Sequence, residues 1–262
     1  MTNSENWPNK FKLFGVDVSR VDYDSAIESI INAAKNDKGG IVSCQAVHAL
    51  ITASQDPDLR EKVNTFSMVT PDGQPVRWAM NLLHKAGLTD RVYGPELMLR
   101  VCQAAAANDV GIYIYGGSEA VAAKLEENLQ KIVPNLKIAG CESPPFRPLT
   151  DEEKVETAKR INDSGAGILF VGLGAPKQDI YAYDNRNAIR PVMLCVGAAF
   201  DFHAGEKSMA PGWMQRNGLE WLFRLASEPR RLWKRYLVTN SLFILKLGQE
   251  LFRKGFTRKT AV

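Results

Sequence analysis

Long apolar runs, secretory features and paired cysteines are missing from this sequence. No stretch reaches 18 uninterrupted apolar residues, so no membrane-spanning helix is expected. The first ten residues, MTNSENWPNK, contain no apolar core of a signal peptide. No CxxC spacing occurs, and three of the four cysteines stand in apolar runs, which is typical of reduced, buried thiols in a cytoplasmic protein; the four are Cys44, Cys102, Cys141 and Cys195.

Several chemical signatures are missing as well. The three histidines, His48, His84 and His203, lie far apart and form no metal-ligand pattern. Neither GxGxxG nor Tyr-x-x-x-Lys is present, which counts against a nucleotide-dependent oxidoreductase or epimerase. The phosphate loop GxxxxGK[S/T] is also missing. What remains is a chain of 262 residues, 45% hydrophobic and 24% charged, which predicts a packed globular protein rather than a disordered one.

Short apolar runs alternate with helical patterns along most of the chain. This alternation predicts a doubly wound, Rossmann-like α/β fold with a parallel sheet, in which ligands bind beyond the carboxyl ends of the strands. Thr150-Asp151-Glu152-Glu153 resembles a capping box at the start of a helix. The predicted strands are Phe11–Val18, Gly40–Gln45, Ser67–Thr70, Gly111–Tyr115, Leu136–Ala139, Ile168–Gly172 and Met193–Val196. The predicted helices are Asp24–Lys35, Pro75–Ala86, Pro95–Asn108, Glu119–Ile132, Asp151–Asp163 and Lys177–Ala188.

After Gly205 the sequence becomes helical, aromatic and basic, so we place a boundary between an α/β domain at 1–205 and a helical segment at 206–262. Pro229 is expected to divide this segment into two helices. From Trp213 to Thr260, eleven Lys and Arg face three Glu, a net charge of +8 in a chain of net +4. Aromatic and basic side chains in alternation suit an anionic membrane surface or RNA, and composition does not separate the two; a solvated helical face is the plainer interpretation.

Asp72 stands in Pro71-Asp72-Gly73, between a predicted strand and a predicted helix. One interpretation is a turn in which Asp72 caps the helix. The other is a general base, because a carboxylate at the carboxyl end of a strand can accept a proton from a bound substrate.

Two glycine-rich junctions follow predicted strands. Val171–Asp179 contains Gly172, Gly174 and Lys177 at the start of a helix, which fits either a phosphate site or a tight structural turn. Gly116 and Gly117 form a second such junction, for which a nucleotide contact and a plain turn both stay open. In Val196–Phe202 the small residues indicate close packing, and a substrate-lining role for Asp201 is a minor alternative.

Taken together, these motifs resemble the WecG/TagA/CpsF family of glycosyltransferases (family 26, the GT-E fold), over roughly Phe14–Phe243. The strongest parts are PDGQPVRW (Pro71–Trp78), DRVYGPELM (Asp90–Met98), VGLGAPKQD (Val171–Asp179), VGAAFDFHAG (Val196–Gly205) and APGWMQRNGLEWLFRLASEPRRLWKRY (Ala210–Tyr236). The resemblance implies an inverting transfer of a sugar from a UDP donor to an undecaprenyl-diphosphate-linked sugar in bacterial cell-surface polysaccharide synthesis. Family members use N-acetylmannosamine or its uronic acid in the named cases, and they lack a metal-binding DxD motif, so no metal cofactor is expected.

The resemblance also assigns roles to particular residues. Asp72 matches the catalytic base. Ser43 and Gln45 stand where the family often has Thr and Asn, and Arg91 matches the Arg ahead of a Gly-x-Asp/Glu step, so these three are candidate catalytic residues beside Asp72. The remaining matches are substrate-binding residues and arginines thought to close over the active site: Gln178, Arg224, Arg231 and Arg235.

This sequence departs from the family pattern at Ser43, Gln45, Glu96, Asp179 and Met209, where Thr, Asn, Asp, Glu and Arg are more usual. The departures leave the donor open, and the chain looks more like exopolysaccharide-pathway members, whose donors vary. The expected partners are a UDP-sugar, a lipid-diphosphate-linked acceptor and the inner face of the cell membrane, with no nucleic acid. The sequence leaves homo-oligomer formation open, and a non-catalytic membrane- or RNA-binding adaptor remains the alternative in another class.

Overall fold

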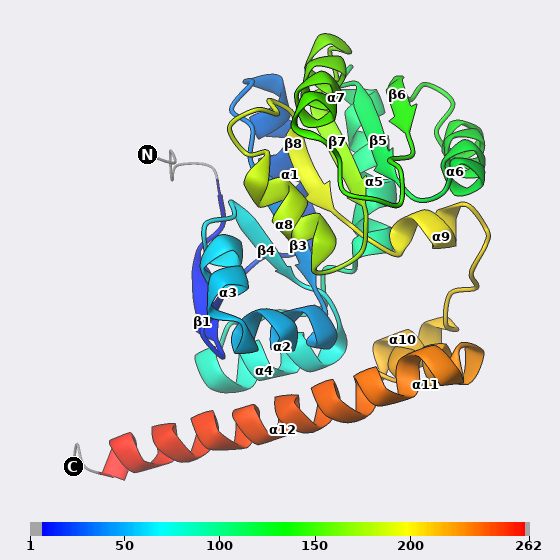
Figure 1. The fold of residues 1–262 in the computed structure, drawn as a ribbon. Helices are drawn as coiled ribbons and strands as arrows, with labels where there is room; N and C mark the ends of the chain where they lie inside the picture. The colour runs from blue at the N-terminus through cyan, green and yellow to red at the C-terminus, as the bar shows by residue number, and fades with distance from the viewer. Residues whose placement is uncertain (1–6, 260–262) are drawn as a thin grey trace.

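A computed structural model of the chain describes residues 7–259 and places six parallel strands in one central sheet (Figure 1). Their order across the sheet is β4-β3-β8-β7-β5-β6, so the chain first builds one edge, crosses to the other and returns to the middle. The strands are β3 (Ile41–Gln45), β4 (Met68–Pro71), β5 (Ile112–Gly116), β6 (Ile138–Glu142), β7 (Ile168–Gly172) and β8 (Val192–Cys195). The predicted doubly wound α/β fold is confirmed.

Helices cover both faces of this sheet, as a parallel sheet requires. One face packs against α1 (Tyr23–Lys35), α5 (Gly94–Ala107), α6 (Glu119–Ile132) and α9 (Ala199–His203). The other packs against α2 (Val47–Gln55), α3 (Pro57–Asn64), α4 (Gln74–His84), α7 (Asp151–Asp163) and α8 (Lys177–Asp184).

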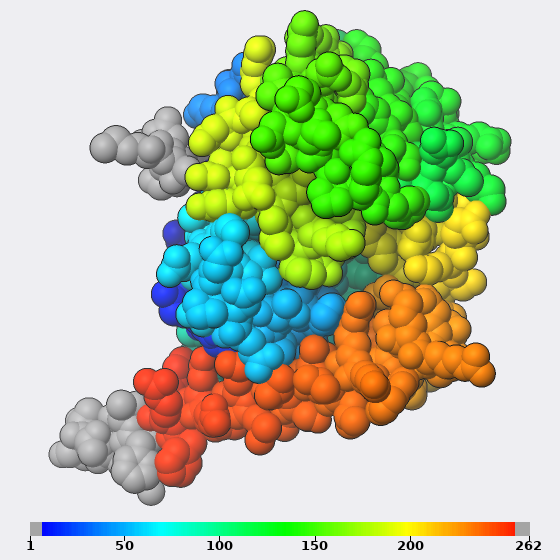
Figure 2. Space-filling model, viewed as in Figure 1, coloured from blue at the N-terminus to red at the C-terminus, as the bar shows by residue number. Residues whose placement is uncertain are grey.

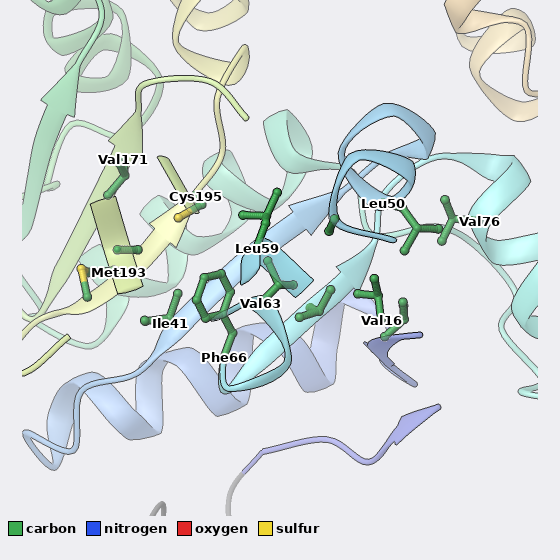
Figure 3. Packing of buried hydrophobic residues seen from close by; sticks show 14 of the residues in the cluster. Val16, Ile41, Leu50, Leu59, Val63, Phe66, Val76, Val171, Met193 and Cys195 are labelled. Carbon is green, nitrogen blue, oxygen red and sulfur yellow. The ribbon is translucent and has the colours of Figure 1, made fainter. Parts of the chain in front are cut away.

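Successive side chains of each strand enter opposite layers of the core. In β7, Ile168 and Phe170 join one apolar cluster while Leu169 and Val171 join the other. Figure 3 shows the second cluster, where Phe66 lies among residues of β3, β7, β8 and α3. Because both faces are buried, the strands appear in the sequence as continuous apolar runs, and this is why most of them were predictable.

The prediction of a single strand at Phe11–Val18 is wrong. The segment forms an antiparallel hairpin of β1 (Lys10–Leu13) and β2 (Val16–Ser19), separate from the main sheet. Phe14 and Gly15 both have positive φ, 54° and 90°, which is the geometry of a two-residue hairpin turn. The hairpin joins the body through Ser19, whose Oγ accepts a hydrogen bond of 3.0 Å from the N–H of Val69 in β4.

Other predicted boundaries hold to within a few residues. The helices Glu119–Ile132 and Asp151–Asp163 agree fully, and the capping box of Thr150 and Glu153 is present. The helix predicted at Lys177–Ala188 ends earlier, at Asp184, and β6 begins two residues later than predicted. The prediction omitted α2, α3 and α9. For α3 the signal was available, because Asp56 caps the helix and Pro57 occupies its first turn.

The C-terminal segment consists of α10 (Gly212–Arg216), α11 (Glu220–Ser227) and α12 (Pro229–Lys259), so a helix does end before Pro229 as expected. In Figures 1 and 2, α12 lies along one edge of the body next to α2 and α4. Residues 260–262 and the side chains of Arg258 and Lys259, counted in the basic charge, lie outside the described part. Within the described part, no helix is both long enough and apolar enough to span a bilayer.

One aromatic side chain fixes α12 to the body. Phe243 is 5% exposed and meets Phe14 edge to face, with ring centroids 5.2 Å apart. The N–H of Phe14 donates to Oε1 of Glu250 at 3.1 Å, so the hairpin turn holds the same helix at a second point. Phe243 therefore belongs to the main hydrophobic core, and α12 packs on the body through it.

We expect Phe243→Ala to lower the free energy of unfolding by about 3 kcal/mol or more, because it leaves a cavity between α12 and the body. Urea denaturation measures this loss. Leu245→Ala, two residues along the same helix at a side chain that is 60% exposed, is the matched control and should change stability by less than about 0.5 kcal/mol. Equal effects of the two substitutions would show that α12 is not anchored through Phe243.

Candidate active site

A cleft of about 750 Å³ lies at the carboxyl ends of the parallel strands. Residues that follow β3, β4, β5, β7 and β8 line one side of it, and residues of α11 and α12 line the other. Figure 2 shows the C-terminal helices lying along this edge of the body. A volume of this size accommodates a nucleotide-sized ligand, and strand ends are where open α/β sheets bind their ligands.

Asp72 lies on the cleft wall directly after β4. The proposal that it caps the following helix is wrong, because the cap of α4 is Gly73, with φ 102° and no side-chain cap bond. The Asp72 carboxylate turns to the start of another helix instead, where Oδ2 accepts a hydrogen bond of 3.1 Å from the N–H of Gly94 in α5. The Asp72 side chain is thus held at the cleft by Gly94 and does not cap α4.

Burial raises the pKa of Asp72 to about 6. The positive charge of Arg91 and the N–H of Gly94 act in the opposite direction, while the negative charge of Glu220 adds to the increase. A carboxyl group with this pKa is mostly ionised at neutral pH, and it binds a proton more strongly than an ordinary aspartate does. Both properties are those of a general base.

Arg91 also lines the cleft, and its guanidinium is held by the C-terminal segment. Its Nη2 lies 2.8 Å from Oε2 of Glu220 in α11 and 3.0 Å from Oε1 of Gln215 in α10. The guanidinium stacks over the ring of Tyr93, 4.1 Å from the ring centroid. Sequence reasoning missed Glu220, Gln215 and Tyr93; the isolated Glu in a basic segment was the available signal for Glu220.

Ser43 and Gln45 are fully buried and lie behind the cleft wall rather than on it. Ser43 Oγ donates to Oδ1 of Asp179 at 2.7 Å. Gln45 Nε2 donates to Ser43 Oγ at 2.8 Å and to Oδ2 of Asp179 at 3.3 Å. Burial raises the pKa of Asp179 to about 6, and these two hydrogen bonds oppose the increase. The three side chains join β3 to the first turn of α8 beneath the cleft.

The glycine-rich loop after β7 forms part of the cleft wall. Gly172 and Gly174 line it together with Gln178, whose Oε1 accepts a hydrogen bond of 3.1 Å from the N–H of Gly174. Lys177, in contrast, is exposed and is not among the lining residues. The structure therefore brings the backbone of this loop to the cleft but directs the lysine elsewhere.

The Gly116-Gly117 pair divides in the same way. Gly117 lines the cleft. Gly116 packs against β7, where an added Cβ would lie 2.6 Å from the carbonyl carbon of Gly172, so only glycine fits there. Gly116 is therefore required for packing against β7, whereas Gly117 is the residue of the pair that faces the cleft.

Arg224, Arg231 and Arg235 all line the side of the cleft formed by α11 and α12. Arg224 lies over the ring of Phe202 at 5.5 Å, and Arg231 pairs with Glu228. Burial and the neighbouring charge of Arg231 lower the pKa of Arg235.

The charge of Arg235 also acts on His48, another lining residue that sequence reasoning missed as a site residue. Burial and then Arg235 lower the pKa of His48 to about 4, so the imidazole is neutral at pH 7. The arginine side of the cleft thus has an electrostatic preference for an anion.

Carboxylates suited to a metal do not gather in the described part of the chain. Among those residues, no group of three or more His, Cys, Asp or Glu side chains is placed to hold a metal ion. Two Asp-x-Asp triplets do occur, at Asp22–Asp24 and Asp56–Asp58. In each, the first Asp caps a helix, α1 or α3, and none of these aspartates lines the cleft.

The fold and the cleft define a doubly wound α/β protein with a cleft at its strand ends, and arginines of the C-terminal helices line the opposite side of that cleft. Residues 11–257 match the model of the glycosyl transferase WecG/TagA/CpsF family, and the chain belongs to this family. It is therefore a glycosyltransferase of cell-surface polysaccharide synthesis. This membership sets aside both the oxidoreductase and the non-catalytic adaptor.

Proposed function

We propose that the protein transfers a sugar, with inversion, from a UDP-sugar to an undecaprenyl-diphosphate-linked sugar. The observation that carries the proposal is the placement of Asp72 in one cleft with Arg224, Arg231 and Arg235. A base on one wall and cations on the other are what a direct displacement at the anomeric carbon needs. A screen of UDP-sugars against a lipid-diphosphate sugar acceptor, with product analysis, tests it and identifies the donor.

In this reaction the acceptor hydroxyl attacks the anomeric carbon while Asp72 takes its proton. The bond from that carbon to the UDP oxygen breaks, and its electron pair leaves with the diphosphate. Guanidinium groups suit the growing negative charge because they form paired hydrogen bonds to phosphate oxygens. Arg224, Arg231 and Arg235 supply these groups, and no metal ion takes part in the proposed step.

The exposed face of α12 supports docking on a membrane surface. Leu237, Ile244 and Leu251 follow one another at intervals of seven, which keeps them on one side of the helix, and a second series runs beside them: Val238, Leu245 and Phe252. All six are exposed, with Ile244 also at the rim of the cleft, whereas Leu232 and Phe243 face the body. Apolar side chains on the outside of a basic helix fit the interface of an anionic bilayer, so we place the enzyme at the inner face of the cell membrane.

Asp72→Asn should reduce turnover about 10²–10⁴-fold, because an amide cannot take the proton of the acceptor. The wild-type rate should fall about tenfold per pH unit below pH 6, the pKa of Asp72, as the carboxylate becomes protonated. Unfolding at pH 8 is the control. Because the folded protein disfavours the ionised form, the Asn variant should be at least as stable as the wild type there. Normal turnover in this variant would remove Asp72 from the mechanism.

Sugar transfer should continue in EDTA. The proposed charge stabilisation uses arginines rather than a divalent cation, so initial rates with and without the chelator should agree within error. A rate lost on chelation and restored by Mg²⁺ or Mn²⁺ would contradict the metal-free step.

Single Ala substitutions of Arg224, Arg231 and Arg235 should each reduce transfer by about 10²-fold, since each removes a group that stabilises the leaving diphosphate. Binding to vesicles with anionic lipid should weaken only about fivefold, in line with roughly 1 kcal/mol per basic residue near such a surface. The contrast should persist with a short-chain, water-soluble acceptor, for which docking is irrelevant.

Leu245→Glu is the matched opposite, because Leu245 is exposed and does not line the cleft. It should reduce vesicle binding and leave transfer to the water-soluble acceptor unchanged. Full activity of all three Ala variants on that acceptor would mean that the C-terminal segment is an anchor only.

A further inference from the structure

The charges of two carboxylates, Asp72 and Glu220, act on Arg91. Arg91 forms its ion pair with Glu220, which is the more distant of the two in sequence. Its Nη2 forms an ion pair with Oε2 of Glu220 at 2.8 Å. The same Nη2 donates a hydrogen bond of 3.0 Å to Oε1 of Gln215. Asp72 is close enough to feel the charge of Arg91, yet its side-chain hydrogen bond comes from the Gly94 N–H instead. Two side chains of the C-terminal segment therefore decide where the guanidinium lies.

The charged groups that act on Asp72 come from two parts of the chain. Arg91 precedes α5, while Glu220 and Arg224 belong to α11. The other titratable neighbours, Tyr23, Tyr93 and Cys44, all have raised pKa values and are neutral at pH 7. Removing the charge of Glu220 would leave Asp72 facing two arginines without an opposing carboxylate.

We propose that Glu220 is a positioning residue of the transfer reaction: it binds the Arg91 guanidinium and so leaves the Asp72 carboxylate free to take the proton of the acceptor. The proposal rests on the role of Asp72 as base. Asp72 is the other carboxylate whose charge acts on Arg91, so without Glu220 it is left to pair with that guanidinium. An aspartate paired with an arginine has a pKa lower by about 1–3 units and is a correspondingly weaker base.

The position of Glu220 in the chain gives this arrangement a second consequence. Glu220 and Gln215 belong to α11 and α10, so Arg91 is bound in this way only when that segment lies against the cleft. The same segment brings Arg224. In this position the segment therefore provides a cation for the leaving group and a carboxylate partner for Arg91 at the same time.

Glu220→Gln tests the proposal with little change in shape. We expect the acidic limb of the pH–rate profile to move about 1 unit or more to lower pH, because Arg91 then acts on Asp72 unopposed. The rate on the alkaline plateau should fall as well, by less than about tenfold for each unit by which the pKa of Asp72 decreases. A merely structural role would lower the rate and leave the limb where it is.

A carboxylate moved to the neighbouring position provides the rescue. In Glu220→Gln combined with Gln215→Glu, Arg91 regains a carboxylate partner in place of the Gln215 amide that already lies 3.0 Å from it. The limb should return toward its wild-type position. Glu250→Gln removes one negative charge from α12 far from Arg91, where Glu250 accepts from the Phe14 N–H, and it should leave the limb unmoved.

A measurement without turnover completes the test. The pH dependence of unfolding free energy, compared between each variant and the same variant carrying Asp72→Asn, gives the pKa of Asp72 directly. The proposal would be overturned if the acidic limb of the pH–rate profile and the pKa of Asp72 both stay at their wild-type values in Glu220→Gln. This holds even if the rate of that variant falls. Full activity of Asp72→Asn would instead overturn the role of Asp72 as base, so the two failures are distinguishable.

Discussion

Arg91 and Glu220 form a buried ion pair between the α/β body and the C-terminal helices. Removing one partner of such a pair typically costs about 3–5 kcal/mol, whereas replacing both by apolar groups is often neutral. The ion pair thus contributes little net stability, and its main effect is to specify how α11 lies against the body. It joins α11, which carries Arg224, to the cleft wall, and α12, which carries Arg231 and Arg235, follows α11 directly in the chain.

The two sides of the cleft divide the chemistry between them. Strand ends on the body supply Asp72 and a glycine-rich backbone, both held by short connections within a rigid sheet. In the proposed reaction, the helical side supplies arginines whose planar guanidinium groups suit the phosphates of the leaving group. Phe243 and the hairpin turn hold that side from below, so the helical wall is attached at its far end as well as at Arg91.

The fold class and most elements were predictable because buried parallel strands and capped helices leave local signals, as at Ile168–Gly172 and Asp151–Asp163. The hairpin at Phe14-Gly15 escaped because one apolar run can contain a turn. Only some residues of the candidate site could be predicted from the sequence. Motif matches named Asp72 and Arg91 as site residues, but no local pattern shows that Gly73 and not Asp72 caps α4, or that Glu220 reaches Arg91 across 129 positions. Such contacts depend on how distant elements dock.

The buried contact between Gln45 and Asp179 changes the meaning of two departures from the family pattern. The family often has Asn at the first position and Glu at the second, so here one side chain is longer by a methylene group and its partner is shorter by one. The two changes offset each other, and the amide of Gln45 still lies 3.3 Å from the carboxylate of Asp179. Neither side chain lines the cleft. The pair is a length-compensated exchange inside the scaffold, at two positions that lie behind the cleft wall.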